Sequence, residues 1–328
     1  MPYSHFTIDD RDTLQILMAY EGLAKWEIAR ILGKHQSSIY RELSRNEKSG
    51  VYLSHRADGE SSKRRQASKI RPKRENDRLM AEVEKRIRDD HSPEQIAGRL
   101  KREHPEDTSW HVSHETIYQH VYARIQEGID LQKHLRQAGK KRKKRSAHKD
   151  NRGKIPGRVF IDERPKIVEK KTRVGDWEGD TVEGGGKKGY ILTYVDRKTK
   201  FLIARKIANK TAANVVIASR KAFASVPEAL KKTITLDNGK EFAKHAAISR
   251  ATGAKIFFAH PYHSWERGLN EHTNGKLRQY YPKKKPLDGI SSRELAKKVK
   301  ALNNRPRKSL GYQTPQEAIT QELFALQT

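Results

Sequence analysis

The sequence contains no cysteine, which excludes disulfides, thiolate metal sites and cysteine nucleophiles. Any bound metal would therefore be held by oxygen or imidazole ligands. Long apolar runs are also absent. None approaches the ~20 residues that a membrane helix needs, and the N-terminal segment MPYSHFTIDDRD lacks the apolar core of a signal peptide. These absences predict a soluble, intracellular protein.

Acidic residues are few compared with basic ones. The 328 residues include 40 Asp and Glu against 69 Lys and Arg, which gives a formal net charge of +29. Such an excess repels itself in a compact fold, so a polyanionic partner is the expected reason for it. Nucleic acid is the first candidate and an anionic membrane surface the second. Because the sequence has no apolar segment that could insert into a membrane, membrane binding is not expected.

The N-terminal segment has the spacing of helices. Thr7 precedes an apolar periodic stretch formed by Ile8, Leu14, Ile16 and Leu17. A second helix is predicted from Lys25 to Leu32, with Trp26, Ile28, Ala29 and Leu32 facing inward, and Gly33 follows as a turn. A third helix over 37–43 would complete a helix-turn-helix. Its outward set would reach base edges and phosphates: Gln36, Ser37, Ser38, Arg41 and Arg45. The alternative is an αα-hairpin with a solvated polar face.

A second helical unit is predicted between Ser92 and Ile125. Ser92-Pro93-Glu94-Gln95 has the pattern of a capping box, and Ser113 begins another helix. The residues expected to face DNA are Ser113, His114, Thr116 and Gln119. The alternative is a packing or dimerisation module. After this unit comes a run of six cations with a generic affinity for phosphate: Lys140, Lys141, Arg142, Lys143, Lys144 and Arg145.

Further along the chain, β-rich segments alternate with helices. Strands are predicted at 176–182, 190–195, 201–204, 233–236 and 255–258, and helices at 212–223 and 266–277. This order indicates a mixed α/β sheet domain. The predicted division is a helix-turn-helix domain (1–60), a basic linker (61–91), a second helix-turn-helix-like domain (92–138), a basic linker (139–164), the sheet domain (165–285) and a C-terminal helical extension (286–328). Residues 61–78 would form either a solvated linker or an extended helix.

Three carboxylates occupy positions suited to metal-dependent phosphoryl transfer. Asp180 lies within the first strand, Asp237 ends the fourth, and Glu271 lies on the helix after the fifth. Two-metal chemistry needs carboxylates on rigid neighbouring elements, and hard oxygen ligands select magnesium or manganese. Most acidic residues are only surface charges, and several lie close enough to be confused with ligands: Asp176, Glu178, Glu183, Asp196, Glu241 and Glu266. The joint placement of the three is more specific than any one of them.

The motifs Trp-Glu-Gly-Asp-Thr at 177–181, Asp-Asn-Gly-Lys-Glu-Phe at 237–242 and the stretch from His260 to Pro282 resemble those of the DDE transposase and retroviral-integrase superfamily. Within it, these motifs and the segment 302–315 are similar to the bacterial IS-thirty family of insertion-sequence transposases. The resemblance covers nearly the whole chain, and His263 and Glu266 depart from the pattern without touching the triad.

This resemblance implies an RNase H-like catalytic fold in which Asp180, Asp237 and Glu271 are catalytic metal ligands, flanked by Asn270 and Asn274. It implies two Mg²⁺ ions, with Mn²⁺ as a substitute, and N-terminal domains that bind the terminal inverted repeats of double-stranded DNA. Cleavage and strand transfer into target DNA would pass through a circular intermediate. Pairing two ends calls for a homodimer or higher oligomer. The expected location is the bacterial cytoplasm, at the nucleoid.

Two other functions stay open on the residues alone. A helix-turn-helix regulator would need no metal triad, and an RNase H-type nuclease would cut without joining. His260, His263 and His272 allow an imidazole metal site, although surface or hydrogen-bonding roles suffice. Tyr280 and Tyr281 would either stack on bases or pack beneath the C-terminal helices, and Trp177 and Trp265 are expected in or around the core.

Overall fold

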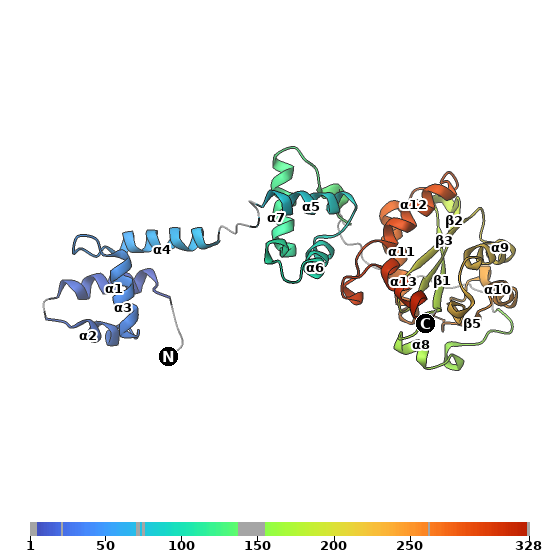
Figure 1. Ribbon diagram of the computed structural model, residues 1–328, viewed down its shortest axis with the longest axis horizontal. Coiled ribbons are helices and arrows are strands. Elements are labelled where there is room, and N and C mark those ends of the chain that lie inside the picture. Colours follow the sequence, from blue (N-terminus) through green and yellow to red (C-terminus); the bar gives the residue numbers. More distant parts are fainter. Residues whose placement is uncertain are drawn as a thin grey trace. The chain divides into compact units, whose positions relative to one another are not determined.

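A computed structural model describes residues 5–20, 22–69, 73, 76–136, 155–261 and 263–326. They form two compact units, divided between Asn76 and Asp77 (Figure 1). The second unit contains a helical subdomain, residues 77–136, and a sheet domain, residues 155–326. Within the described part of the chain, no helix combines the length and the apolar character needed to cross a membrane.

The N-terminal unit is helical, as predicted. It consists of α1 (Ile8–Ala19), α2 (Lys25–Ile31), α3 (Gln36–Asn46) and α4 (Ser54–Lys69). The Thr7 hydroxyl accepts from the Asp10 N–H, and the Thr7 N–H donates to the Asp10 carboxylate, so a capping box begins α1. The core is formed by Leu14, Ile28, Ala29, Ile39, Leu43, Tyr52 and Ala57.

Three apolar residues placed on the inward faces in this unit are exposed: Ile8 (37%), Ile16 (60%) and Trp26 (53%). Ile16 and Trp26 each lie two positions from a buried residue, Leu14 and Ile28, and two positions are roughly 200° around a helix. Trp26 instead lies against the Arg30 guanidinium, 5.8 Å from the ring centroid.

The helical subdomain contains α5 (Asp77–Arg88), α6 (Pro93–Glu103) and α7 (His114–Gln126). The capping box at Ser92 is present. The segment 61–91, predicted as a linker, is largely helical. α4 runs to Lys69, in agreement with the extended-helix alternative, whereas α5 belongs to this subdomain, so the linker prediction was wrong there. Leu79, Val83 and Ile87 follow each other every four residues and are fully buried.

The sheet domain has five described strands in the order β3-β2-β1-β4-β5. They are β1 (Asp176–Glu183), β2 (Tyr190–Asp196), β3 (Leu202–Ile207), β4 (Thr233–Leu236) and β5 (Lys255–Phe258). β1, β2 and β3 pair antiparallel, whereas β4 is parallel to both β1 and β5. The predicted mixed sheet is therefore confirmed.

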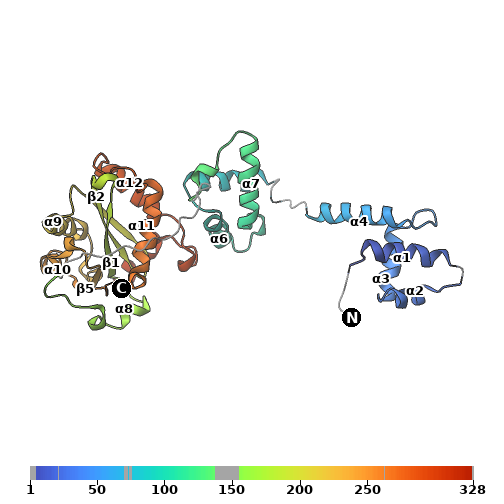
Figure 2. The same cartoon turned by 180° about the vertical axis from the view of Figure 1, so that it is seen from behind.

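Helices cover both faces of this sheet (Figures 1 and 2). α9 (Ala212–Phe223) and α10 (His245–Thr252) pack on one face with Leu192, Tyr194 and Ile234. α11 (Gly268–Tyr280) and α12 (Ser292–Asn303) pack on the other with Ile191 and Val195. The remaining helices are α8 (Ile167–Lys170) and α13 (Pro315–Ala325), and the described 3-10 turns are η2 (Thr108–Trp110), η3 (Gln132–His134), η4 (Ile161–Glu163), η5 (Gly185–Lys187), η6 (Glu228–Leu230), η7 (Lys240–Phe242), η8 (Ser264–Arg267) and η9 (Lys308–Leu310).

The sheet domain extends beyond the predicted bounds of 165 and 285. Ile155, expected in a linker, is buried in the core beneath α9 and α10, and Phe160 forms a parallel bridge with Phe258. On the other face, Leu295 and Leu302 of α12 are buried against the sheet. The C-terminal helices are thus part of the domain and not an extension, because their apolar residues cover a face that would otherwise be exposed.

Candidate active site

Asp180 and Asp237 come together because β1 and β4 are parallel neighbours. Glu178 pairs with Thr235, and the same register continued by two residues sets Asp180 beside Asp237. Both carboxylates lie close to the guanidinium of Arg267. Its Nη2 lies 3.8 Å from Asp180 Oδ1 and 3.6 Å from Asp237 Oδ2. The two carboxylates therefore share one cation.

Asp180 is held in a defined orientation within a largely buried site. The Thr181 N–H donates to its Oδ1 and the Asn274 amide to its Oδ2, each at 2.8 Å. Burial raises the pKa of Asp180 to about 6, and the negative charge of Asp237 acts in the same direction, whereas Arg267 opposes both. A cation placed between the carboxylates would favour the charged form of each.

These residues fit a hard divalent cation. The Asp237 Oδ1 accepts from the Gly239 N–H at 2.9 Å, so both aspartates are oriented by backbone or amide donors. Positioned carboxylate oxygens of this kind suit magnesium or manganese. Arg267 also donates from Nη1 to the Gly179 carbonyl at 2.9 Å, which fixes a positive charge at the position where the two carboxylates converge.

Glu271 is not gathered with the two aspartates. It lies in the first turn of α11 and is exposed. In the described residues, the carboxylate oxygens of Asp180, Asp237 and Glu271 do not all lie within 4.8 Å of one another. Glu271 nevertheless lies three residues before Asn274, which contacts Asp180. Its helix is therefore next to the site, with the carboxylate turned outward.

Asn270 and Asn274 have different roles on α11. The Asn274 side chain contacts Asp180, as expected for a flanking residue. Asn270 is fully buried, and its backbone N–H donates to Glu178 Oε2 at 3.0 Å. The Thr193 hydroxyl lies 3.1 Å from Asn274 Oδ1 and 3.4 Å from Asn270 Oδ1. Asn270 thus attaches α11 to the sheet, and the Asn274 side chain reaches from α11 to Asp180.

The neighbouring acidic residues have structural partners. Asp176 accepts from Arg173 and Thr233, and Glu178 is paired with Arg197 at 3.0 Å. Asp196 accepts from the backbone of Gly175 and from Thr199. Glu241 and Glu183 share Lys210, at 3.8 and 3.4 Å. These contacts give structural roles to five of the six acidic residues that could be confused with metal ligands in the sequence.

The face of α3 predicted to contact DNA is polar and accessible. Gln36, Arg41 and Arg45 are exposed, and Ser37 and Ser38 are half-buried. The Arg41 guanidinium donates to the Ser37 carbonyl at 3.1 Å and to its hydroxyl at 2.9 Å, which holds that side chain along the helix. The geometry is that of a helix able to present cations, and contact with DNA stays a prediction.

The predicted set on α7 is only partly exposed. Ser113, His114 and Gln119 are exposed, but Thr116 is 6% exposed and its expected outward position was wrong. Ser113 is the N-cap, and its hydroxyl accepts from the Thr116 N–H at 3.0 Å. The Thr116 and Ser113 hydroxyls also lie 2.9 Å apart, which holds the Thr116 side chain against the cap residue instead of in solvent. The cationic run from Lys140 to Arg145 lies outside the described residues.

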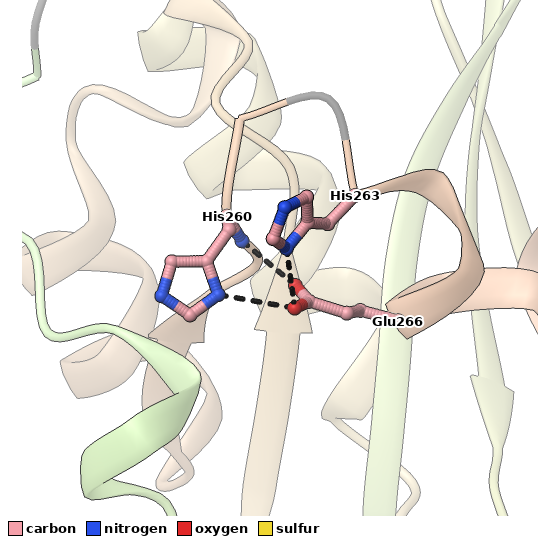
Figure 3. Close-up of side chains that lie close together, drawn as sticks. All are labelled: His260, His263 and Glu266. Atoms are coloured by element: carbon pink, nitrogen blue, oxygen red, sulfur yellow. Dashed lines mark hydrogen bonds and ion pairs between the residues drawn. The ribbon is translucent and has the colours of Figure 1, made fainter.

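The segment before α11 contains a cluster of His260, His263 and Glu266 (Figure 3). Glu266 Oε1 lies 3.0 Å from the Nδ1 atoms of both histidines. The backbone N–H of His260 donates to Glu266 Oε2 at 2.8 Å. His260 Nε2 is 2.8 Å from Asp162 Oδ2, so carboxylates raise the pKa of His260. These hydrogen bonds account for the cluster and tie the segment to η4.

The aromatic residues divide between the core and the surface. Trp177 is 1% exposed, as expected, and Tyr281 is buried beneath α12. Trp265 is 71% exposed and stacks on His263, with ring centroids 4.4 Å apart, so of the two expected positions it does not occupy the core. Within the described residues, His272 is not part of the histidine cluster.

Arg267 is the site residue that sequence reasoning missed. It ends η8 and is the N-cap residue of α11. Its convergence on Asp180 and Asp237 has no signal in the local sequence, because it depends on how α11 packs against β1 and β4.

Comparisons with known proteins agree with this architecture. Residues 171–264 match the family described as integrase core domain, and residues 2–46 match a helix-turn-helix domain. A helix-turn-helix unit joined to an integrase-type core fits the predicted class of protein, the DNA transposases. The catalytic core of BIV integrase, a solved structure, matches 48% of this chain and 100% of its own at 18% identity, with a TM-score of 0.38.

Full-length relatives identify the family. The chain is 41% identical to the transposase for insertion sequence element IS4351 of Bacteroides fragilis, over 97% of this chain and 96% of that one. It is 36% identical to the transposase for IS1086 of Cupriavidus metallidurans, over 98% and 96%. It is 35% identical to transposase InsI for IS30C of Escherichia coli, over 96% and 83%. The chain belongs to the IS30 family of insertion-sequence transposases.

Proposed function

We propose that Asp180, Asp237 and Glu271 form the metal-binding triad with which this transposase cleaves the ends of its insertion sequence and joins them to target DNA. The observation that supports this most directly is the convergence of Asp180 and Asp237 from adjacent parallel strands onto one cationic group. Glu271 would complete the set by turning inward from the first turn of α11.

The triad is suited to two Mg²⁺ ions, with Mn²⁺ as a substitute. When bound, such a pair supplies activation of the attacking oxygen and stabilisation of the leaving oxygen. The chain's own contribution is orientation. Asn274 and the Thr181 N–H fix the two oxygens of Asp180, and the Gly239 N–H fixes Asp237. Arg267 would exchange its long contacts with the aspartates for the phosphate of the bound strand.

The reaction would proceed by two in-line displacements at phosphorus. Water first attacks the phosphodiester at an element end, which breaks the P–O3′ bond across from it and releases a 3′ hydroxyl. That hydroxyl then attacks a second phosphodiester, forming one P–O bond as another breaks. Joining of the element's ends through a circular intermediate before integration is the order that we infer for this chain.

The N-terminal unit would hold the element's inverted repeats by the exposed face of α3. The α7 face and the cations of 140–145 would add contacts to the backbone of double-stranded DNA. Two ends must be held together for joining, so the active assembly would be at least a homodimer.

The test is a magnesium-dependent assay on a plasmid carrying the element's own ends. Wild type should give nicked and joined ends, and Asp237→Asn should bind the same DNA but give neither product. Asp288→Asn, which changes an exposed aspartate outside the site, is the matched control and should retain activity. Equal activity of Asp237→Asn and wild type would remove Asp237 from the triad. Nicking without joining would instead favour a nuclease.

A further inference from the structure

A second basic feature lies on α11, away from the aspartates. His272, Lys276 and Gln279 line one side of a cavity of about 980 Å³. Lys276 comes two residues after Asn274, which is roughly 200° around the helix. The cavity therefore opens on the side of α11 opposite to the side that contacts Asp180. We call it the basic cavity; its other cationic lining residues are Arg136, Arg305, Arg307 and Lys308.

Arg307 is the strongest sign that the basic cavity lacks a partner. Arg307 is only 7% exposed. Its Nη2 donates to the Leu302 carbonyl at 2.8 Å. Its Nη1 is buried and has no hydrogen-bond partner among the described residues. A buried guanidinium nitrogen without an acceptor is costly, so an acceptor from outside the chain is expected there.

Other cations crowd around Arg307. Burial, followed by the charges of Arg307, Arg136 and Arg305, lowers the pKa of Lys276 to about 7. Burial and the charges of Arg305 and Arg136 lower the pKa of Arg307 to about 10. The Arg136 Nη2 also lies 3.0 Å from where a side chain at Gly275 would begin, so it approaches α11 next to Lys276.

The carboxylates of the basic cavity do not neutralise this group. Asp90 lies 3.5 Å from Arg305 and 3.0 Å from His134, and Glu94 lies 2.6 Å from Lys308. In the part of the chain that the structure describes, no carboxylate lies within 4.0 Å of the charged nitrogens of Arg136, Lys276 or Arg307. Like charges held together without a counterion destabilise a fold, and binding an anion would relieve that repulsion.

We propose that the basic cavity binds backbone phosphates of duplex DNA through Arg136, Lys276 and Arg307. Guanidinium and ammonium groups are the usual donors to phosphate oxygens, and all three residues line the basic cavity. The proposal rests on the proposed action on DNA and specifies where the duplex is held. Because α11 separates the cavity from Asp180, the bound phosphates belong to DNA flanking the strand that is cut.

The salt dependence of DNA binding tests this proposal. Wild type, Lys276→Met and Arg136→Ala would be titrated against a duplex of the element's terminal sequence at several salt concentrations. Each phosphate contact contributes about 0.9 to the slope of log K against log salt. Each variant should therefore lose affinity and roughly one unit of slope. Lys297→Met and Arg293→Ala remove exposed cations of α12 outside the cavity and should match wild type.

Slopes for Lys276→Met and Arg136→Ala equal to those of the controls would overturn the proposal. Thermal melts check folding, and Lys276→Gln and Arg136→Gln are the replacements if either variant does not fold. If wild type binds and joins DNA but the cavity variants have the same salt slope as wild type, the phosphate site in the basic cavity is refuted and the proposed function is not. A wild type that binds no DNA refutes the proposed function as well. Stabilisation by inorganic phosphate without any change of DNA slope would identify a small-anion site and contradict the DNA proposal.

Discussion

Replacing Asn274 with Ala tests how strongly α11 prepares Asp180 for a metal. The Asn274 amide donates to Asp180 Oδ2 at 2.8 Å in a largely buried site, and alanine removes this donor. A hydrogen bond to a charged group contributes about 1.5–3 kcal/mol. At 1.4 kcal/mol per factor of ten, the variant should need roughly 10- to 150-fold more Mg²⁺ for half-maximal cleavage.

The assay is strand cleavage of the element's ends across a Mg²⁺ series, with DNA affinity measured separately. Affinity without metal should stay near the wild-type value, because Asn274 orients a carboxylate and α3 holds the DNA. Asn304→Ala, an exposed asparagine after α12, is the control and should leave the Mg²⁺ curve in place. An Asn274→Ala curve that overlays wild type would refute the positioning role. A loss of DNA affinity equal to the loss of cleavage would point to general damage.

Two further predictions concern stability. Ile39 is fully buried in the N-terminal unit, so Ile39→Ala should lower the free energy of unfolding of that unit by about 2–5 kcal/mol in urea melts followed by circular dichroism, whereas Ile31→Ala, at a position 55% exposed, should change it little. Equal effects at the two positions would contradict the assigned core. Folding lowers the pKa of Lys276 from 10.5 to about 7. Between pH 7 and pH 10.5 the unfolded state therefore binds more protons at this residue than the folded state does. Lys276 thus lowers the free energy of unfolding as the pH falls from 10.5 through 7. Without DNA, Lys276→Met should melt roughly a few degrees above wild type at pH 7, with a smaller gap near pH 10.5. A gap that does not change with pH would contradict this assignment.

The sheet could be predicted closely because its strands are short apolar runs between clear turns. β4 and β5 have the predicted bounds, and β1 and β2 each continue one residue further. Helix α5 was missed although its signal is present, because Leu79, Val83 and Ile87 recur every four residues, as on one face of a helix. The missed burial of Thr116 depends on a cap, and the exposure of Trp265 depends on its stacking with His263.

The candidate site was partly available from sequence. Motifs and strand order placed Asp180 and Asp237, since a shared register follows from parallel pairing. The positions of Arg267 and Arg307 required the tertiary packing of α11, which no local pattern encodes. The exposure of Glu271, in the first turn of α11, also has no signal in the local sequence.

The central claim is that three carboxylates bind the catalytic cations together. Its most direct measurement is anomalous diffraction from crystals of the protein bound to its element ends with Mn²⁺. The account predicts Mn²⁺ peaks bounded by Asp180 and Asp237, with Glu271 turned inward to join them. Peaks that avoid the two aspartates, or a Glu271 that stays turned outward while Mn²⁺ is bound, would contradict it.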